Sequence, residues 1–145
     1  MKLLVKFGTG AFAAVLALAG AGLTGGAAKA DASGKAALVV SKDQVSRGED
    51  DYIDNCVMCH GYELNDGEFG PPIKGSFFRK KWTGKSVGEL FTKTVMTMPQ
   101  SNPDSLDPGV YADIMAYVFA QNGITPGDND MPSDAEALNK IPLPW

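Results

Sequence analysis

The chain contains few of the residues that usually build metal or redox sites. Of its 145 residues, two are cysteine and one is histidine. A structural zinc site normally needs four Cys or His ligands, so these three residues are one too few. The sequence shows no Val- and Ile-rich strand pattern of the kind that accompanies a thioredoxin-like cysteine pair. A disulfide between Cys56 and Cys59 would close a very small loop and would constrain the unfolded chain little.

Long hydrophobic segments are also missing after the first thirty residues. Residues 1–30 follow the order of a secretory signal, with two early lysines, an apolar stretch of small residues, and Ala28-Lys29-Ala30 at the expected cleavage site. We expect cleavage after Ala30, export to the periplasm and a single domain over residues 31–145. A retained membrane anchor is the alternative, but the Ala- and Gly-rich core is short and weakly hydrophobic for a span. We therefore expect no membrane span in the mature chain.

Acidic residues outnumber basic ones. The full chain has 13 Lys and Arg against 17 Asp and Glu, a formal charge of −4. Three of the lysines and none of the acids lie in residues 1–30, so the mature protein is more acidic still. This balance argues against nucleic-acid binding. It favours a partner with a basic docking surface, because opposite charges speed encounter.

The few cysteines and the single histidine are concentrated in one motif, Cys56-Val57-Met58-Cys59-His60. On a helix, residues at i, i+3 and i+4 share a face, so both thiols and the imidazole point the same way. This Cys-x-x-Cys-His spacing is typical of c-type haem attachment. The motif predicts one covalently attached haem c, held by thioether bonds to Cys56 and Cys59, with His60 as a ligand of the iron.

The second axial position of the iron separates electron carriers from catalysts and sensors. A second histidine is excluded, because His60 is the only one. Lysine, tyrosine or an open position remain alternatives. The main candidates are the methionines of the mature chain, Met58, Met96, Met98, Met115 and Met131.

Among these methionines we favour Met98 as the second ligand. Met58 lies inside the attachment motif, and Met115 lies in the apolar stripe of a predicted helix, where packing explains it better. Met98 precedes a proline in an irregular stretch, and a residue before proline favours an extended backbone. Such a segment can lay a thioether against the haem. Met131 also precedes a proline, but it follows the last long helix.

The pattern after residue 40 predicts helices and no strand. A first helix begins at about Ser41 and runs into the Cys-x-x-Cys-His motif. Gly48 lies in its apolar stripe, which indicates either close approach by another helix or simply a weak position. Ser86 and Glu89 form a capping box that opens a short helix. Further elements are a Gly/Pro-rich loop over residues 61–75, a strong helix from Asp107-Pro108 to Gly123, and a helical turn over residues 133–139.

The one basic cluster of this acidic chain surrounds a tryptophan. It consists of Arg79, Lys80, Lys81 and Lys85, with Trp82 between them. One interpretation is a solvated loop. The other is that Arg79 or Trp82 donates a hydrogen bond to a haem propionate and so balances its charge.

The order of helix, Cys-x-x-Cys-His, Gly/Pro loop, Met-Pro and amphipathic helix resembles a class I, monohaem cytochrome c. More narrowly, the chain resembles cytochromes associated with quinoprotein (PQQ) alcohol dehydrogenases, through Phe69-Gly70-Pro71-Pro72-Ile73-Lys74-Gly75, Lys81-Trp82, Thr97-Met98-Pro99, Tyr111-Ala112-Asp113-Ile114 and Ala116-Tyr117. The resemblance implies an all-α fold whose first and last helices cross around the haem. It also implies that the backbone carbonyl of Pro71 or Pro72 holds the ring of His60.

These features together predict a periplasmic electron carrier and not an enzyme. A haem with both axial positions filled has no place for a substrate, and His/Met ligation raises its potential. The expected donor is a dehydrogenase, by resemblance a quinoprotein alcohol dehydrogenase, and the expected acceptor is an oxidase or another cytochrome. Two alternatives remain: a five-coordinate haem enzyme or gas sensor, and a haem subunit bound permanently inside a dehydrogenase complex.

Overall fold

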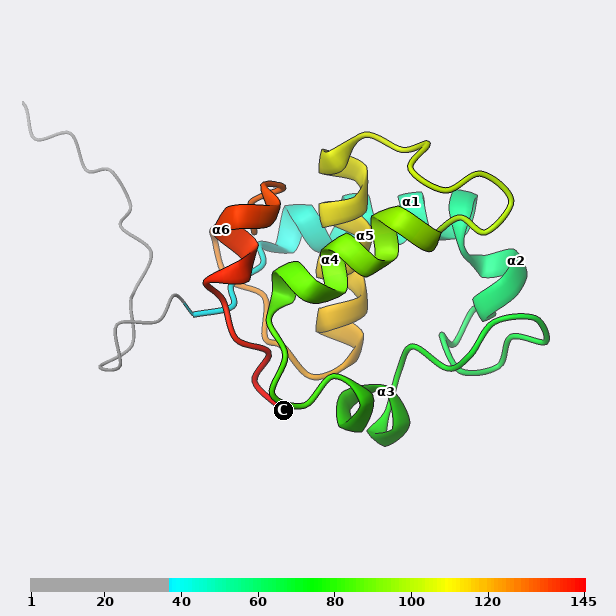
Figure 1. The fold of residues 1–145 in the computed structure, drawn as a ribbon, viewed down its shortest axis with the longest axis horizontal. Coiled ribbons are helices and arrows are strands. Elements are labelled where there is room, and N and C mark those ends of the chain that lie inside the picture. Colours follow the sequence, from blue (N-terminus) through cyan, green and yellow to red (C-terminus); the bar gives the residue numbers. More distant parts are fainter. Residues whose placement is uncertain (1–36) are drawn as a thin grey trace, which may run out of the picture.

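The computed structural model describes residues 37–145, which form an all-helical domain (Figure 1). The helices of this part of the chain are α1 Lys42–Asn55, α2 Val57–His60, α3 Ser76–Lys81, α4 Val87–Thr97, α5 Pro108–Gln121 and α6 Ala135–Asn139. Over residues 37–145 there is no strand, only two isolated β-bridges, so the all-α prediction is confirmed. None of these helices is long and apolar enough to cross a bilayer. The predicted signal segment and its cleavage site lie outside the described residues.

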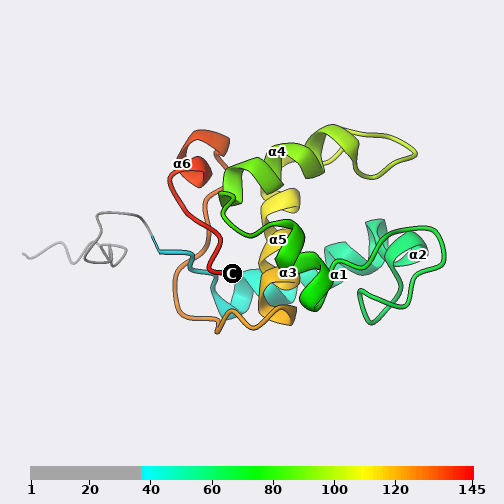
Figure 2. The same ribbon diagram turned by 60° about the horizontal axis from the view of Figure 1, so that its bottom comes forward.

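The first and last long helices cross and pack against each other (Figure 2). α1 begins after Ser41, whose hydroxyl accepts a hydrogen bond from the Gln44 amide at 2.9 Å. At the crossing, α1 presents Gly48, and a Cβ there would overlap the backbone carbonyl of Asp113 on α5. Close approach of another helix is therefore the correct interpretation of Gly48.

The helices α4 and α5 begin at the residues that the sequence predicts. The capping box of α4 is present, with the Glu89 amide donating to the Ser86 hydroxyl at 3.0 Å and the Ser86 amide donating to the Glu89 carboxylate at 2.8 Å. α5 begins at Pro108, but the side chain of Asp107 makes no capping hydrogen bond. Most of α5 is buried in the core: Tyr111, Ala112, Ile114, Met115, Ala116, Tyr117, Val118 and Phe119.

The basic stretch after the Gly/Pro loop is partly helical, which the sequence analysis missed. α3 includes Arg79, Lys80 and Lys81, so these three residues are helical and do not form a loop, although Lys80 and Lys81 are exposed to solvent as that interpretation expects. Its N-cap is Gly75, which has no side chain to cap the helix. Phe78 is its one buried residue. A helix this short, without a capping residue, is stabilised by tertiary packing and leaves little local signal.

The segment after α5 returns past the beginnings of α1 and α4. Near its start, the Gly127 amide donates to the Val40 carbonyl at 2.8 Å. α6 follows within the predicted turn over residues 133–139 and packs against α4. The segment ends with a β-bridge between Pro142 and Ser86, next to the start of α4. This part of the chain therefore joins the beginning of α1 to the beginning of α4.

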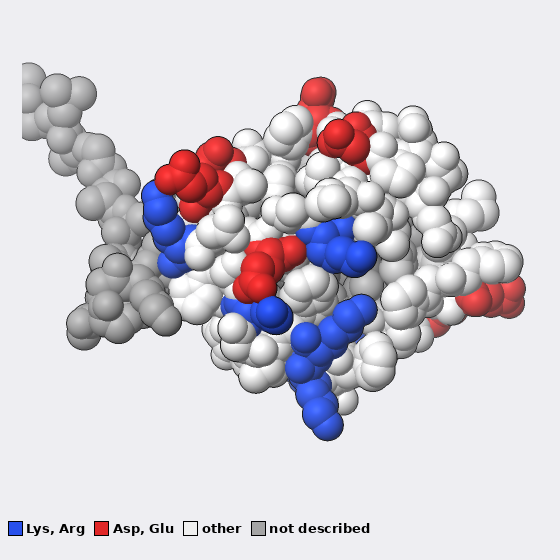
Figure 3. All heavy atoms as spheres, viewed as in Figure 1, with Lys and Arg blue, Asp and Glu red and all other residues white. Residues whose placement is uncertain are grey.

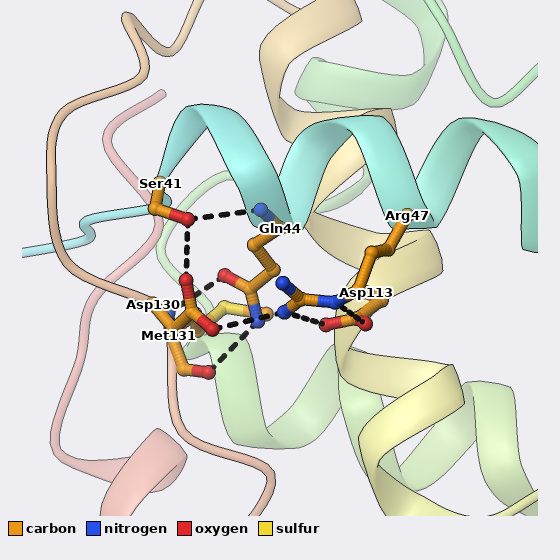
Figure 4. A network of polar contacts seen from close by, with 6 residues as sticks. All are labelled: Ser41, Gln44, Arg47, Asp113, Asp130 and Met131. Carbon is orange, nitrogen blue, oxygen red and sulfur yellow. Dashed lines mark hydrogen bonds and ion pairs between the residues drawn. The ribbon is translucent and has the colours of Figure 1, made fainter.

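A group of polar side chains holds this returning segment to α1 and α5 (Figure 4). We call it the α1 polar network; its members are Ser41, Gln44, Arg47, Asp113, Asp130 and Met131. The buried side chain of Gln44 donates from Nε2 to the Met131 carbonyl at 2.9 Å, and its Oε1 accepts a hydrogen bond from the Met131 backbone amide at 2.7 Å. The Arg47 guanidinium forms ion pairs with two carboxylates: Nε lies 2.6 Å from Asp113 Oδ2, and Nη2 lies 2.9 Å from Asp130 Oδ2.

Candidate haem site

A cavity of about 720 Å³ lies between α2, α3, α4 and α5. Its walls are mostly apolar, with Ile73, Phe78, Leu90, Ile114, Met115, Val118 and Phe119 among the lining residues. Both cysteines, the histidine and Met98 also line it. An apolar cavity with a few polar or ligating groups is the usual form of a cofactor site.

The Cys-x-x-Cys-His motif forms the turn from α1 into α2. Cys56 is both the C-cap of α1 and the N-cap of α2, and α2 contains Cys59 and His60. All three residues line the cavity, as helical spacing predicted. The cysteines are half-buried and His60 is 8% exposed. Burial, together with the nearby Cys59, raises the pKa of the Cys56 thiol to about 12. Both sulfurs thus stand at the cavity wall beside the imidazole.

The ring of His60 is oriented by a backbone carbonyl in the Gly/Pro loop. Its Nδ1 lies 2.9 Å from the Pro71 oxygen. A carbonyl oxygen can only accept, so Nδ1 carries the proton and Nε2 keeps its lone pair for a metal. Of the two prolines that the resemblance left open, Pro71 makes this contact, while Pro72 lines the cavity next to it. A partner of this kind makes the imidazole a more basic ligand.

Gly70 lets the loop approach the histidine closely. The Gly70 amide donates to the Cys59 carbonyl at 2.8 Å. A Cβ at this position would lie 2.6 Å from His60 Nδ1 and 2.7 Å from Cε1, which is too close for a real side chain. The loop therefore needs glycine here in order to deliver the Pro71 carbonyl to the ring.

Met98 lines the cavity from the end of α4. Its backbone is extended, with φ −130° and ψ 149°, as the following proline predicted. The Met98 amide donates to the Thr94 carbonyl at 2.8 Å. The Tyr111 hydroxyl of α5 donates to the Met98 carbonyl at 2.6 Å. Both backbone groups of Met98 are thereby held.

Two buried tyrosines play parallel parts around the cavity, and sequence reasoning assigned neither. Tyr111 holds the carbonyl of Met98, and Tyr52 of α1 donates to the Gly61 carbonyl at 2.7 Å, directly after His60. Burial raises the pKa of Tyr52, so its hydroxyl remains a donor at neutral pH. In the sequence, Tyr52 falls in the first predicted helix, and Tyr111 falls in the long helix after Asp107-Pro108 and in one motif of the family resemblance.

The other methionines are placed differently. Met58 and Met96 are 83% and 69% exposed. Met131 is buried in the α1 polar network, where its backbone pairs with Gln44. Met115 is a core residue, as predicted, but it also lines the cavity. Met98 is thus the methionine that lines the cavity from an irregular segment.

Basic side chains gather over α3 and α4 on the face shown in Figure 3. Of the predicted cluster, Lys81 and Trp82 line the cavity, and Lys93 of α4 joins them. Arg79 is half-buried in the last turn of α3 and is not one of the lining residues. Lys85 instead pairs with Glu89 at 2.9 Å. Of the two residues considered for a propionate, the tryptophan is the one at the cavity wall.

The donor set of this cavity fits a c-type haem. The cavity offers two thiols for thioether bonds, an imidazole with an available Nε2, and a thioether from a separate segment of the chain. In addition, the indole Nε1 of Trp145, beyond the wall residues Phe78 and Phe119, is buried without a hydrogen-bond partner in the described structure.

Comparison with known families matches residues 43–118 to the family described as cytochrome c oxidase, cbb3-type, subunit III. Neither curated proteins nor solved structures give a match. The matched residues run from the first turn of α1 through most of α5 and include the whole Cys-x-x-Cys-His motif. Because the match covers more than half of the chain, the protein belongs to this family and contains a cytochrome c domain.

Proposed function

We propose that this protein is a monohaem c-type cytochrome that carries single electrons between other redox proteins. The observation that carries the proposal is the shared cavity of Cys56, Cys59, His60 and Met98, with His60 already oriented by the Pro71 carbonyl. When bound, the haem supplies an iron that cycles between the ferric and ferrous states. The family is consistent with this, because a cytochrome c domain implies electron transfer by haem.

Different residues of the chain would attach the haem and ligate its iron. Cys56 and Cys59 supply the thiols for covalent attachment, and His60 supplies Nε2 as the proximal ligand. Met98 supplies its sulfur as the second ligand, and Tyr111 keeps the backbone of Met98 in place. The apolar walls exclude water, which favours the less charged iron state and raises the potential. With both ligands supplied by the protein, no position is left for a substrate.

We further propose where the protein works and with which partners. Residues 1–30 direct it to the periplasm and are removed after Ala30, leaving the cytochrome c domain within residues 31–145. The donor is a dehydrogenase, and the resemblance around Phe69–Gly75 and Thr97-Met98-Pro99 supports a quinoprotein alcohol dehydrogenase. The acceptor is an oxidase or another cytochrome.

The proposal is tested by producing the protein with haem-maturation machinery. A pyridine haemochrome spectrum should show haem with both vinyl groups converted to thioethers. The dithionite-reduced visible spectrum should be low-spin and should not change when carbon monoxide is added, because Met98 holds the second position. A rapid carbon monoxide adduct in the unaltered protein would contradict the carrier function and would support an enzyme or gas sensor.

A matched pair of variants assigns the second ligand. Met98→Ala should convert the protein to one that binds carbon monoxide. Met96→Ala should leave the spectrum unchanged, because Met96 is 69% exposed and lies two residues away on α4. Equal behaviour of the two variants would remove Met98 from the proposal. Gel filtration with and without a candidate dehydrogenase would distinguish a free carrier from a permanent subunit.

A further inference from the structure

Asn122 places a buried side-chain amide at the end of α5. It is the C-cap of that helix and is 7% exposed. Its Nδ2 donates to the Ile73 carbonyl and to the Val118 carbonyl, both at 2.9 Å. Its Oδ1 accepts a hydrogen bond from the Gly75 amide at 3.0 Å. Because a side-chain amide offers two protons and one acceptor oxygen, every polar atom of Asn122 has a partner.

Two of these hydrogen bonds hold the end of the Gly/Pro loop from outside the loop. The carbonyl of Ile73 is bonded to α5 in this way, and the Ile73 amide donates to the Leu64 carbonyl within the loop at 2.8 Å. Both backbone groups of Ile73 are therefore held. The neighbouring Gln121 adds a further contact, because its Oε1 accepts from Lys74 Nζ at 3.2 Å. Residues 73–75 are thus fastened to the end of α5.

The loop carbonyl that orients the histidine lies two positions before Ile73. The oxygen of Pro71 accepts from His60 Nδ1 at 2.9 Å, and Pro72 connects it to Ile73. The ring of Pro72 fixes its own φ and restricts the residue before it to an extended backbone. A displacement of Ile73 is therefore passed on to Pro71, because the residue between them has little freedom to absorb it.

The Pro71 carbonyl accordingly depends on an anchor on each side. On one side, the Gly70 amide donates to the Cys59 carbonyl at 2.8 Å, within the Cys-x-x-Cys-His motif itself. On the other side, the anchor is Asn122, which belongs to a different helix. Asn122 lies beyond residues 43–118, so this second anchor comes from a part of the chain that the family match does not include.

We infer that Asn122 is a positioning residue for the proximal ligand. Through its hold on the loop, it keeps the Pro71 carbonyl at hydrogen-bond distance from His60 Nδ1. The inference rests on the proposed haem attachment. An acceptor at Nδ1 makes the imidazole a more basic ligand, and a more basic ligand stabilises ferric iron more than ferrous iron. Loss of the Asn122 contacts should therefore raise the reduction potential.

The test compares Asn122→Ala with Gln44→Ala in the holoprotein. Gln44 is the matched control, because it is also a buried side-chain amide bonded to one backbone amide and one backbone carbonyl, but in the α1 polar network. Urea unfolding should show that both variants lose stability. Only Asn122→Ala should raise the reduction potential, because only its contacts reach the loop that orients His60.

The ring N–H of His60 gives a direct readout of the loop. The chain has one histidine, so ¹⁵N-histidine labelling of the ferrous holoprotein should give a single ring N–H signal. In Asn122→Ala we expect this proton to exchange with water at least about tenfold faster than in the unaltered protein, because the loosened loop opens more often. In Gln44→Ala the exchange rate should not change.

A second variant decides the matter if Asn122→Ala does not yield holoprotein. Asn122→Asp has nearly the same shape and keeps an oxygen for the Gly75 amide, but it removes the protons donated to Ile73 and Val118. We expect faster exchange of the His60 proton here as well. Because the new charge also acts on the potential, proton exchange is the deciding readout for this variant.

The outcomes separate this inference from the proposed function. An unchanged potential in Asn122→Ala, or an unchanged exchange rate of the His60 proton in the Asn122 variants, would overturn the inference while leaving the carrier function intact. An equal rise in potential in Gln44→Ala would overturn it too, because general loss of stability would then explain the effect. A pyridine haemochrome of the unaltered protein without thioether-linked haem would overturn the proposed function and, with it, this inference.

Discussion

The α1 polar network and the haem cavity are built on opposite plans. In the network, side chains bond to one another and to nearby backbone, so Gln44, Arg47 and Asp130 have partners from within the described chain. In the cavity, hydrogen bonds hold the backbone or turn a ring, as Pro71 and Tyr111 do, and the groups that could bind a ligand face the open volume. A network whose polar groups bond to one another stabilises the fold. A cavity whose ligating groups face the open volume is instead suited to binding a ligand.

The largest expected effect comes from breaking the crossing of α1 and α5, which joins the two regions. Gly48→Ala would place a methyl group against the Asp113 carbonyl, and we expect a loss of about 3 kcal/mol in the free energy of unfolding. Gly109→Ala on α5 is the matched control, because a Cβ there meets nothing within 4 Å. Urea unfolding of both variants measures the difference. Equal stability of the two variants would refute the close approach.

Breaking the network at its buried centre should have the next largest effect. Gln44→Ala leaves the backbone amide and carbonyl of Met131 without partners, and we expect a loss of about 2 kcal/mol. The visible spectrum of the holoprotein should not change, because Gln44 does not line the cavity. Thermal unfolding and the haem spectrum, recorded on one preparation, check both halves of this prediction. A spectral change would mean that the two regions are coupled.

Loosening the cavity should cost less stability but alter the haem. Tyr111→Phe removes the hydrogen bond to the Met98 carbonyl, which we expect to lower the free energy of unfolding by about 1 kcal/mol. Because Met98 is then held less firmly, the reduced holoprotein should bind carbon monoxide faster than the unaltered protein. Tyr117→Phe, on the same helix, is the control. If both variants bind carbon monoxide at the same rate, Tyr111 does not position Met98.

The smallest effect concerns the exposed edge of the network. Hydrogen bonds from Ser41 and then Arg47 lower the pKa of Asp130, so the folded state favours its ionised form. The resulting stability is present above the unfolded pKa of about 3.9 and is lost as the pH falls through the lower folded value. Asp130→Asn should therefore lower the free energy of unfolding at pH 6 by less than about 1 kcal/mol, which thermal unfolding would show as a slightly lower melting temperature. Below pH 4, the stability of this variant should fall less steeply with pH than that of the unaltered protein. Glu136→Gln, which removes an exposed acid on α6 outside the network, is the matched control.

Local signals in the sequence predicted the helices that carry their own start and stop residues. Ser86 with Glu89 opens α4, Pro108 opens α5, and the proline after Met98 keeps that residue extended. α3 was missed because its N-cap is a glycine and its single buried residue, Phe78, is fixed by distant contacts. Short-range capping can be recognised in one sequence, but a helix stabilised by tertiary packing cannot.

The candidate site divides in the same way. The spacing of Cys56, Cys59 and His60 predicted that they share one wall, and that is where the structure places them. The choice of Pro71 over Pro72, the hydroxyl of Tyr111 at the Met98 carbonyl, and the need for glycine at position 70 became visible only in three dimensions. Each joins residues that are at least ten positions apart in the chain, so no local pattern records it.

By itself, the sequence determined the chemistry that this protein can offer: two thiols and one imidazole at helical spacing, few methionines as partners, and helices bounded by their own caps. Only the tertiary structure decided which methionine lines the cavity from an irregular segment and which carbonyl orients the histidine. The physical reason is range. Helix capping and motif spacing act over three or four residues, whereas the orientation of a ligand depends on contacts between segments that meet only when the chain is folded.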